Sequence, residues 1–191
     1  MGKGRLEAFS DGVFAVIITI MVLELKVPQG SDMAALRPEI PVFLSYVLSF
    51  VFVGIYWNNH HHMLHAVHKV NGFVLWANLH LLFWLSLVPF ITAWMGQNHR
   101  LAIPVALYGV VLFMSGMAYY ILSRALIAIQ GQDSALAIAV GRDFKGILSL
   151  VIYACAVALS MVHTWISIAL YISVAFIWFV PDRRIENKIS E

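Results

Sequence analysis

Three groups of residues in this chain have the chemistry for more than packing, and the first lies at its start. Arg5, Ser10 and Asp11 stand at the entry to an apolar segment that continues to Leu25. Ionisable groups in such a position are costly in a membrane unless they pair or face water. Their spacing concentrates them in the first two turns of a helix. The pattern predicts a helix whose polar end is held by neighbouring helices.

A second polar group interrupts the third apolar segment. Trp76 and His80 share a helix face at spacing i, i+4, and Asn78 lies between them. A buried indole N–H or amide requires an acceptor, which Ser10 and Asp11 would offer at a similar depth. The alternative is that Trp76 belongs to an interfacial aromatic belt and His80 is a satisfied core histidine. The predicted polar network consists of Arg5, Ser10, Asp11, Trp76, Asn78 and His80.

Histidines form the third group. His61 and His65 have the i, i+4 spacing of a metal-binding pair, and His60, His62 and His68 lie beside them. No cysteine or carboxylate stands nearby to complete a metal site, so we expect no metal and no other cofactor here. A pH-sensing role is favoured over ligation because imidazoles titrate near neutral pH.

The composition indicates the medium in which these groups lie. Hydrophobic residues make up 61% of the 191 residues, mean hydropathy is +0.84, and only 12% of residues are charged. A soluble domain has about twice that charged share. The chain is therefore predicted to be an integral membrane protein in contact with the lipid bilayer. No basic stripe suggests nucleic-acid binding, and the single cysteine, Cys155, excludes an intrachain disulfide.

Segments of about 20 apolar residues can cross a bilayer, and six candidates are separated by polar breaks. The predicted fold is an all-α membrane protein in which residues 1–191 form one six-helix domain. The last two candidates are short and the turn between them, near His163, is barely marked. The predicted spans are 9–25, 40–59, 73–95, 101–129, 144–162 and 164–180.

Lysine and arginine positions predict the orientation. With a cytoplasmic N-terminus, the far side would hold three basic residues, Lys26, Arg37 and Arg100, and the cytoplasmic side would hold nine. This distribution follows the positive-inside rule, and an even number of spans places both termini in the cytoplasm. The nine are Lys3, Arg5, Lys69, Arg124, Arg142, Lys145, Arg183, Arg184 and Lys188.

The first apolar segment carries a stripe of its own. Gly12, Val16, Thr19 and Leu23 recur at i, i+4, i+7 and i+11, with Ile20 beside them. One interpretation is a helix buried among others, with Thr19 bonded back to the Ala15 carbonyl. The other is a pore-lining helix, in which several copies stack apolar rings that gate by dewetting around one hydroxyl ring. Periodicity alone does not choose between them.

The quoted residues also carry a resemblance. Arg5-x-x-x-Phe9-Ser10-Asp11, followed by a helix ending Val22-Leu23-Glu24-Leu25, resembles the start of bacterial relatives of the endolysosomal potassium channel family. Those channels lack a Thr-Val-Gly-Tyr-Gly filter, and so does this chain. The resemblance covers about the first half of the sequence. It continues in Tyr56-Trp57-x-x-His60-His61, Trp76-x-Asn78 and Val88-Pro89-Phe90-x-Thr92.

The resemblance implies a homotetramer of six-helix chains, with the first helix lining a central pore. Val16, Ile20 and Leu23 then fall on the hydrophobic constriction, and Thr19 falls on the position linked to potassium preference. Arg5, Ser10 and Asp11 fall on the polar motif that clamps the helix. Val16 stands at the narrowest layer, where isoleucine is commoner. Its smaller side chain would make the gate close less tightly. His80 is a second departure and would add pH sensitivity.

The function predicted from these features is a modestly selective potassium channel of the cell membrane. No nucleophile-and-base pair or phosphate-binding glycine loop suggests an enzyme. Two alternatives stay open. One is a proton-permeable pathway or transporter that uses His80, Asp11 and the histidines between 60 and 68. The other is a haem- or metal-binding membrane protein that uses pairs such as His61 and His65.

Overall fold

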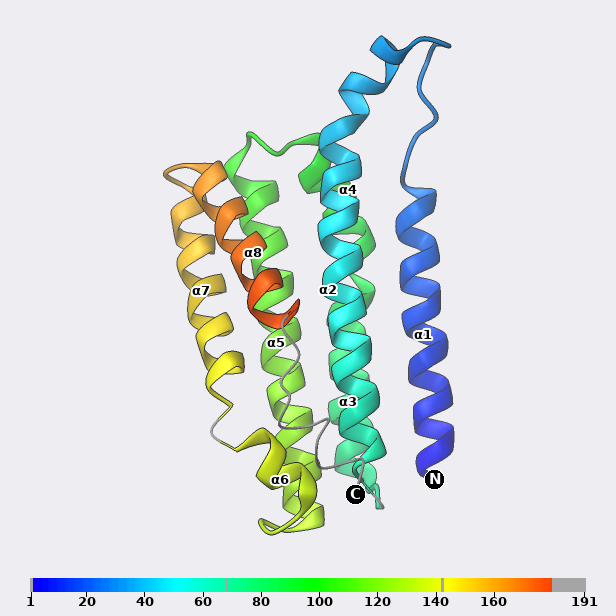
Figure 1. Cartoon of the computed structure of the whole chain (residues 1–191), viewed down its shortest axis with the longest axis vertical. Helices are drawn as coiled ribbons and strands as arrows, with labels where there is room; N and C mark the ends of the chain where they lie inside the picture. The colour runs from blue at the N-terminus through cyan, green and yellow to red at the C-terminus, as the bar shows by residue number, and fades with distance from the viewer. Residues whose placement is uncertain (1, 68, 142, 180–191) are drawn as a thin grey trace.

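The computed structural model describes residues 2–67, 69–141 and 143–179, and within these ranges all regular structure is helical (Figure 1). The long helical stretches run up and down along one long axis. They are α1 (Lys3–Leu23), the short 3-10 helix η1 (Met33–Glu39), α2 (Ile40–His65), α3 (Gly72–Ser86), α4 (Val88–Gln97), α5 (Ala102–Gln130), α6 (Ala135–Val140), α7 (Phe144–Ser160) and α8 (Thr164–Phe179).

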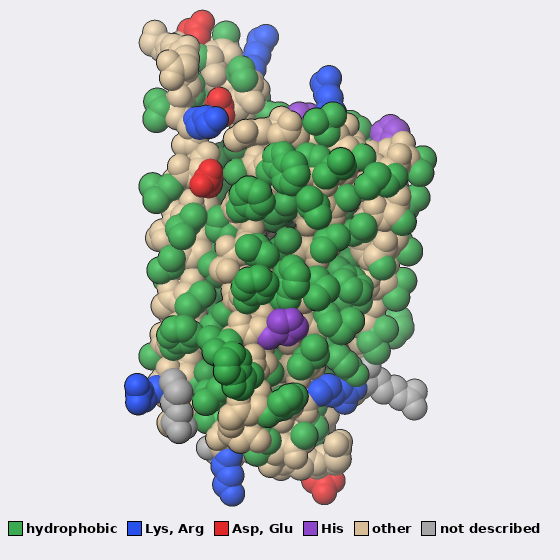
Figure 2. All heavy atoms as spheres, turned by 180° about the vertical axis from the view of Figure 1, so that it is seen from behind, with side chains coloured by type: hydrophobic (Ala, Val, Ile, Leu, Met, Phe, Trp, Pro, Cys, Tyr) green, Lys and Arg blue, Asp and Glu red, His purple; other side chains and the backbone are tan. Residues whose placement is uncertain are grey.

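Four helical stretches are long and apolar enough to cross a membrane: α1, η1 with α2, α3 with α4, and α5. Helices α7 and α8 are apolar but shorter, with 17 and 16 residues. At 1.5 Å per residue each is about 25 Å long, somewhat less than the ~30 Å of a hydrocarbon core. Figure 2 shows hydrophobic side chains over the middle of one face, with lysine and arginine towards the two ends.

Helix boundaries differ from the sequence-based expectation at several places, and α1 begins at Lys3, six residues before 9. Helix α2 continues to His65, six residues beyond 59, because these residues keep the helical register, with Met63 and Leu64 buried and His61 and His65 exposed. The third span divides at Leu87, where Pro89 removes a backbone N–H donor from the first turn of α4. The linker between 130 and 142 contains the short helix α6. The expected end of the last span, at 180, lies outside the described residues.

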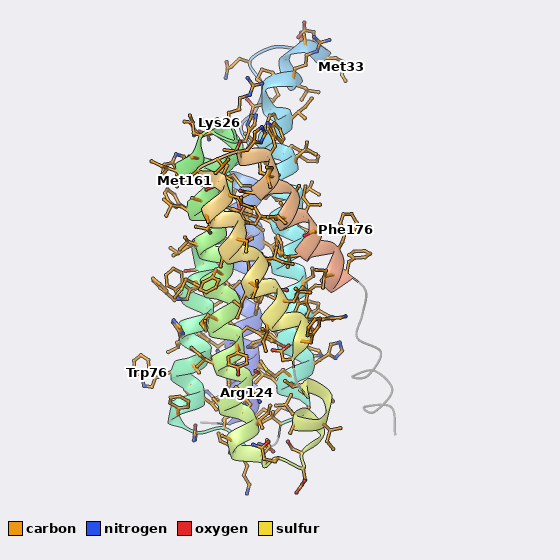
Figure 3. The ribbon with its side chains drawn as sticks, turned by 90° about the vertical axis from the view of Figure 1, so that its left-hand side faces the viewer. Lys26, Met33, Trp76, Arg124, Met161 and Phe176 are labelled. Atoms are coloured by element: carbon orange, nitrogen blue, oxygen red, sulfur yellow. The ribbon has the colours of Figure 1, made fainter. Side chains whose placement is uncertain are left out.

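The ends of the bundle carry the basic residues in the grouping expected from the sequence. Lys3, Lys69 and Arg124 lie towards the end where α1 begins, and Lys26 lies at the opposite end (Figures 1 and 3). Of the nine residues assigned to one side, Arg142, Arg183, Arg184 and Lys188 lie outside the described part of the chain.

Hydroxyl groups form hydrogen bonds between helices in the interior of the bundle. Thr92 of α4 donates to Ser49 of α2 over 2.7 Å, and Ser49 and the Tyr108 hydroxyl of α5 share a hydrogen bond of 2.9 Å. Tyr171 of α8 donates to the Val105 carbonyl of α5 over 3.0 Å. All these side chains are buried. Because lipid offers no partner to a free polar group, pairing hydroxyls between helices fixes which helices are neighbours.

The contact between α5 and α8 depends on a glycine. A Cβ atom at Gly109 would overlap the Tyr171 hydroxyl and would lie 2.8 Å from Cγ2 of Val157. Tyr171 is fully buried, so its ring has no space into which to move. Small residues at such positions let membrane helices approach closely.

We expect Gly109→Ala to destabilise the protein by ~1–3 kcal/mol, since the added methyl group overpacks this contact. The matched control is Gly54→Ala in α2, where a Cβ meets nothing within 4 Å. That change should be neutral or stabilising by up to ~1 kcal/mol, because alanine favours a helix interior. Unfolding midpoints in detergent compare the two variants, and equal midpoints would contradict the packing argument.

Candidate functional site

Helix α1 has one face against the bundle and one face free of it. Its buried residues recur every three or four positions and pack mainly on α2, α3 and α4. In Figure 1, α1 stands at one edge of the bundle. The chain therefore holds α1 from one side only and leaves the rest of its surface open. The buried residues are Leu6, Ser10, Phe14, Ile17 and Met21.

The stripe singled out in the sequence lies on the open surface. Val16, Ile20 and Leu23 are 54%, 41% and 79% exposed, and Gly12 and Thr19 are exposed as well. The Thr19 hydroxyl donates to the Val16 carbonyl over 2.9 Å, one residue away from the Ala15 acceptor expected for a buried helix. Within a single chain the stripe thus packs against nothing, and in the membrane it must face lipid, another subunit or a pore.

The polar end of α1 is held by a buried chain of hydrogen bonds. The Asn78 Nδ2 group donates to Ser10 Oγ over 2.9 Å, and Ser10 donates in turn to the Leu6 carbonyl over 2.8 Å. On its other side, Asn78 Oδ1 lies 2.7 Å from His60 Nε2. Because Oδ1 only accepts, His60 must donate here and carries its proton on Nε2. The three polar side chains are at most 1% exposed, so the chain of bonds joins α1, α2 and α3 out of contact with solvent.

A second polar contact joins α1 to α2 at the surface. The Trp57 Nε1–H donates to Asp11 Oδ1 over 3.0 Å, and the Trp57 ring stacks on His61 with centroids 6.0 Å apart. At the start of α1, Lys3 Nζ donates to the His65 carbonyl over 3.1 Å. The same Nζ lies 3.7 Å from Glu7 Oε1. Polar contacts therefore fix the first half of α1, whereas apolar packing alone holds its second half.

The structure brings together only part of the network expected from the sequence. Ser10 and Asn78 are hydrogen-bonded, but Asp11 pairs with Trp57 in place of Trp76. Trp76 is 74% exposed and projects away from the bundle (Figure 3). His80 accepts a hydrogen bond from Trp84 Nε1 over 2.9 Å within α3. Arg5 is exposed and makes no side-chain hydrogen bond or ion pair with the described residues.

Two partners in this arrangement were not assigned to the network from the sequence. The sequence places His60 among its histidine neighbours, and it marks Trp57 only by the family motif Tyr56-Trp57-x-x-His60-His61. The signal that separates His60 from those neighbours is its helical register. It follows the buried Ser49 and Val53 by 11 and 7 positions, which places all three on the inward face of α2. His61 and His65 fall on the opposite, exposed face.

The remaining histidines cluster without forming a metal site. The His61 ring lies 5.7 Å from the His62 ring and 6.1 Å from the His65 ring, centroid to centroid. Among the residues that the structure describes, no three histidine, cysteine or acidic side chains are placed to hold one metal ion. His68 lies outside the described residues. The cluster is therefore a basic, aromatic surface at the end of α2.

This geometry supports positioning of a helix and not chemical catalysis. The buried polar residue of α1, Ser10, is satisfied by hydrogen bonds inside the chain, and beyond Asp11 the exposed residues of α1 are apolar except for Thr19. A helix fixed at one end, with a bare apolar stripe that includes a single hydroxyl, is suited to associate with copies of itself. Assembled around an axis, such stripes would line a narrow passage.

Comparison with known proteins identifies relatives over the whole chain. The family model described as the endosomal/lysosomal potassium channel TMEM175 matches residues 5–89. A potassium channel of Chryseobacterium sp. (strain P1-3) is 55% identical over 191 residues, covering 100% of both chains. The human endosomal/lysosomal proton channel TMEM175 is 40% identical over 81 residues, which are 36% of this chain and 16% of the human protein.

The fold has a counterpart among solved structures. The crystal structure of a lysosomal potassium-selective channel TMEM175 homolog from Chamaesiphon minutus superposes with a TM-score of 0.79 and 27% identity. The match covers 93% of this chain and 96% of that one. The likeness therefore includes the second half of the chain, for which no sequence motif was recognised.

We expect Asn78→Leu to lower the free energy of unfolding by ~1–3 kcal/mol, because a buried His60 N–H loses its acceptor. The matched control, Asn58→Leu, changes an exposed asparagine near the end of α2 that makes no hydrogen bond with the described residues. Unfolding midpoints in detergent should fall for the first variant only. Equal midpoints would show that the buried hydrogen bonds add little to the anchoring of α1.

Proposed function

Since this chain belongs to the family of the endosomal/lysosomal potassium channel TMEM175, we propose that it forms a potassium channel of the cell membrane. Four copies surround one pore, and each contributes six membrane-spanning segments: α1, α2, α3 with α4, α5, α7 and α8. The basic residues at the end where α1 begins support cytoplasmic termini. The fourfold assembly is proposed from the family resemblance.

The observation that carries the proposal is the exposed stripe of α1. Helices of one chain cover Phe14, Ile17 and Met21, so the opposite surface is left for contacts outside the chain. A fourfold axis beside α1 would bring Val16, Ile20 and Leu23 of each copy into successive rings. Rings of this kind exclude water from a narrow pore and close it by dewetting, with no mobile plug required.

Thr19 supplies the polar group between these rings. Its hydroxyl proton is already used in the bond to the Val16 carbonyl, so the oxygen can offer the pore only lone pairs. An oxygen that accepts and does not donate favours a cation over an anion. Four such oxygens at one level would replace part of the hydration shell of a potassium ion, as carbonyl oxygens do in other filters.

The primary test is ion flux from proteoliposomes that contain the purified full chain. With potassium, sodium or proton gradients applied in turn, potassium flux should exceed sodium flux. Absence of potassium flux in vesicles with correctly inserted protein would overturn the proposal.

A second candidate, proton permeation, is favoured by one observation, the similarity to the human proton channel. In this chain Asp11 and His80 are the ionisable groups on α1 and α3 that proton transfer would use. Each makes a single hydrogen bond to a tryptophan, which leaves further lone pairs or N–H groups available. Proton flux that persists without potassium would support this candidate.

We expect Val16→Ala and Leu23→Ala to raise potassium conductance several-fold, because a smaller ring lowers the barrier to wetting. The matched control is Val22→Ala, which removes the same groups from an exposed valine of α1 outside the stripe. Planar-bilayer recordings of the three variants provide the measurement. Equal conductance of Val16→Ala and Val22→Ala would indicate that Val16 faces lipid or a neighbouring subunit.

We expect Thr19→Val to lower the preference for potassium over sodium, because the isosteric valine lacks the oxygen acceptor. Thr19→Ser retains that oxygen and should keep the preference close to that of the wild type. The reversal potential under bi-ionic potassium and sodium conditions measures the difference. If both variants match the wild type, the selective step lies elsewhere in the pore.

A further inference from the structure

A cavity separate from α1 lies between α2, α5, α7 and α8. The described part of α8 ends at Phe179, above the level at which α7 begins (Figure 1). Trp178 of α8 borders the cavity, and its indole N–H donates to Ser149 Oγ over 2.9 Å. None of the residues proposed to line the pore borders this cavity.

The lining is mostly aromatic. Tyr56, Tyr119 and Tyr153 border the cavity together with Trp178, and the rings of Tyr56 and Tyr119 meet edge to face with centroids 6.1 Å apart. Aromatic faces attract cations through the ring quadrupole, and several rings around one space form the usual site for an organic ammonium group. The lining thus offers apolar contact and a preference for positive charge.

Tyr153 contributes a hydroxyl to this lining. Tyr153 is 3% exposed, and its hydroxyl makes no hydrogen bond with the described residues. Tyr153 borders the cavity, so its ring and hydroxyl are placed beside a ligand bound there. The cavity therefore holds a polar atom that a ligand can satisfy.

One carboxylate stands at the polar end of the cavity. Asp143 precedes α7, and its Oδ1 accepts the Gly146 N–H over 3.2 Å. No ion pair joins it to another described residue; the Arg124 guanidinium lies over the Tyr120 ring, 5.1 Å from its centroid. Burial raises the pKa of the Asp143 carboxyl, although the Gly146 N–H and the positive charge of Arg124 act in the opposite direction. Within the described residues, no ion pair compensates the carboxylate.

We propose that this cavity binds a lipophilic organic cation, with its ammonium group at Asp143 and its apolar body among Tyr56, Tyr153 and Trp178. The charged group of the site lies at one end and the aromatic side chains lie further along, as such a ligand requires. Asp143 lies at the start of α7, whereas Tyr153 lies ten residues further along the helix, about 15 Å at the rise of an α-helix. A ligand that enters from the interface would place its charge at the end of α7 and its apolar part inside the bundle.

Isothermal titration of the purified full chain in detergent tests the proposal, with benzyltrimethylammonium as the probe and neutral benzyl alcohol as the reference. The wild type should bind the cation at least about tenfold more tightly than the alcohol, since only the cation gains the carboxylate and the ring quadrupoles. Equal affinities would overturn the proposal. This comparison requires no variant, so its result does not depend on mutant folding.

The variant Asp143→Asn removes the charge and keeps the local structure. Asparagine caps a helix as well as aspartate does and tolerates the left-handed conformation of this residue, whose φ is 40°. The variant should bind the cation about tenfold or more weakly. Asp133→Asn, at an exposed residue outside the cavity, is the matched control and should bind as the wild type does. Undiminished binding in Asp143→Asn would place the probe elsewhere, including in the pore.

The source of the natural ligand is distinguished in the same assay. Displacement of the probe by phosphatidylethanolamine and not by phosphatidylglycerol would identify a lipid amine headgroup, and no displacement by either would identify a soluble amine. Potassium flux of Asp143→Asn without the probe should equal that of the wild type. Binding and conduction are therefore measured separately. A failed binding experiment does not contradict the proposed potassium channel, and absence of potassium flux does not contradict the proposed binding site.

Discussion

The requirement that every buried polar group be paired inside the protein governs this structure. Lipid supplies no hydrogen-bond partner, so the cost of an unpaired amide or imidazole is far greater than it is at a wet surface. The bonds from Ser10 to Asn78 and from Asn78 to His60 meet this requirement with one side chain from each of three helices. They also determine the rotation of α1 about its axis, because Ser10 can face Asn78 in only one orientation. The stripe through Val16 and Leu23 then faces away from the bundle.

Polar contacts and apolar packing hold different halves of α1. In its first half, Lys3, Ser10 and Asp11 bond to α2 and α3, whereas in its second half only Phe14, Ile17 and Met21 pack on the bundle. Lipid tails are as apolar as these side chains, so van der Waals packing without a hydrophobic driving force holds the second half. The apolar rings proposed for the gate lie in that half.

Helices α2, α4, α5 and α8 are also joined by hydrogen bonds between buried polar groups, with different residues. Hydroxyls of Thr92, Ser49 and Tyr108 pair across α4, α2 and α5, and Tyr171 bonds to the backbone of α5 beside Gly109. Between α2, α5, α7 and α8 the packing leaves a cavity, where Tyr153 and Asp143 are placed to contact a ligand. The chemistry of the cavity comes from the aromatic side chains and the carboxylate that line it.

The sequence by itself was sufficient for the class of protein, the approximate helices and the stripe on α1. These follow from hydrophobic length, charge placement and a period near 3.6, all of which are local properties of the chain. It was also sufficient to indicate that Ser10 and Asn78 belong together, since few polar groups occur at that depth. The tertiary structure alone decided that Asp11 pairs with Trp57, that His60 turns inwards while His61 turns outwards, and that Trp76 stands apart from both. Which side chains meet depends on how helices are rotated and offset against one another, and packing of the whole bundle sets those variables.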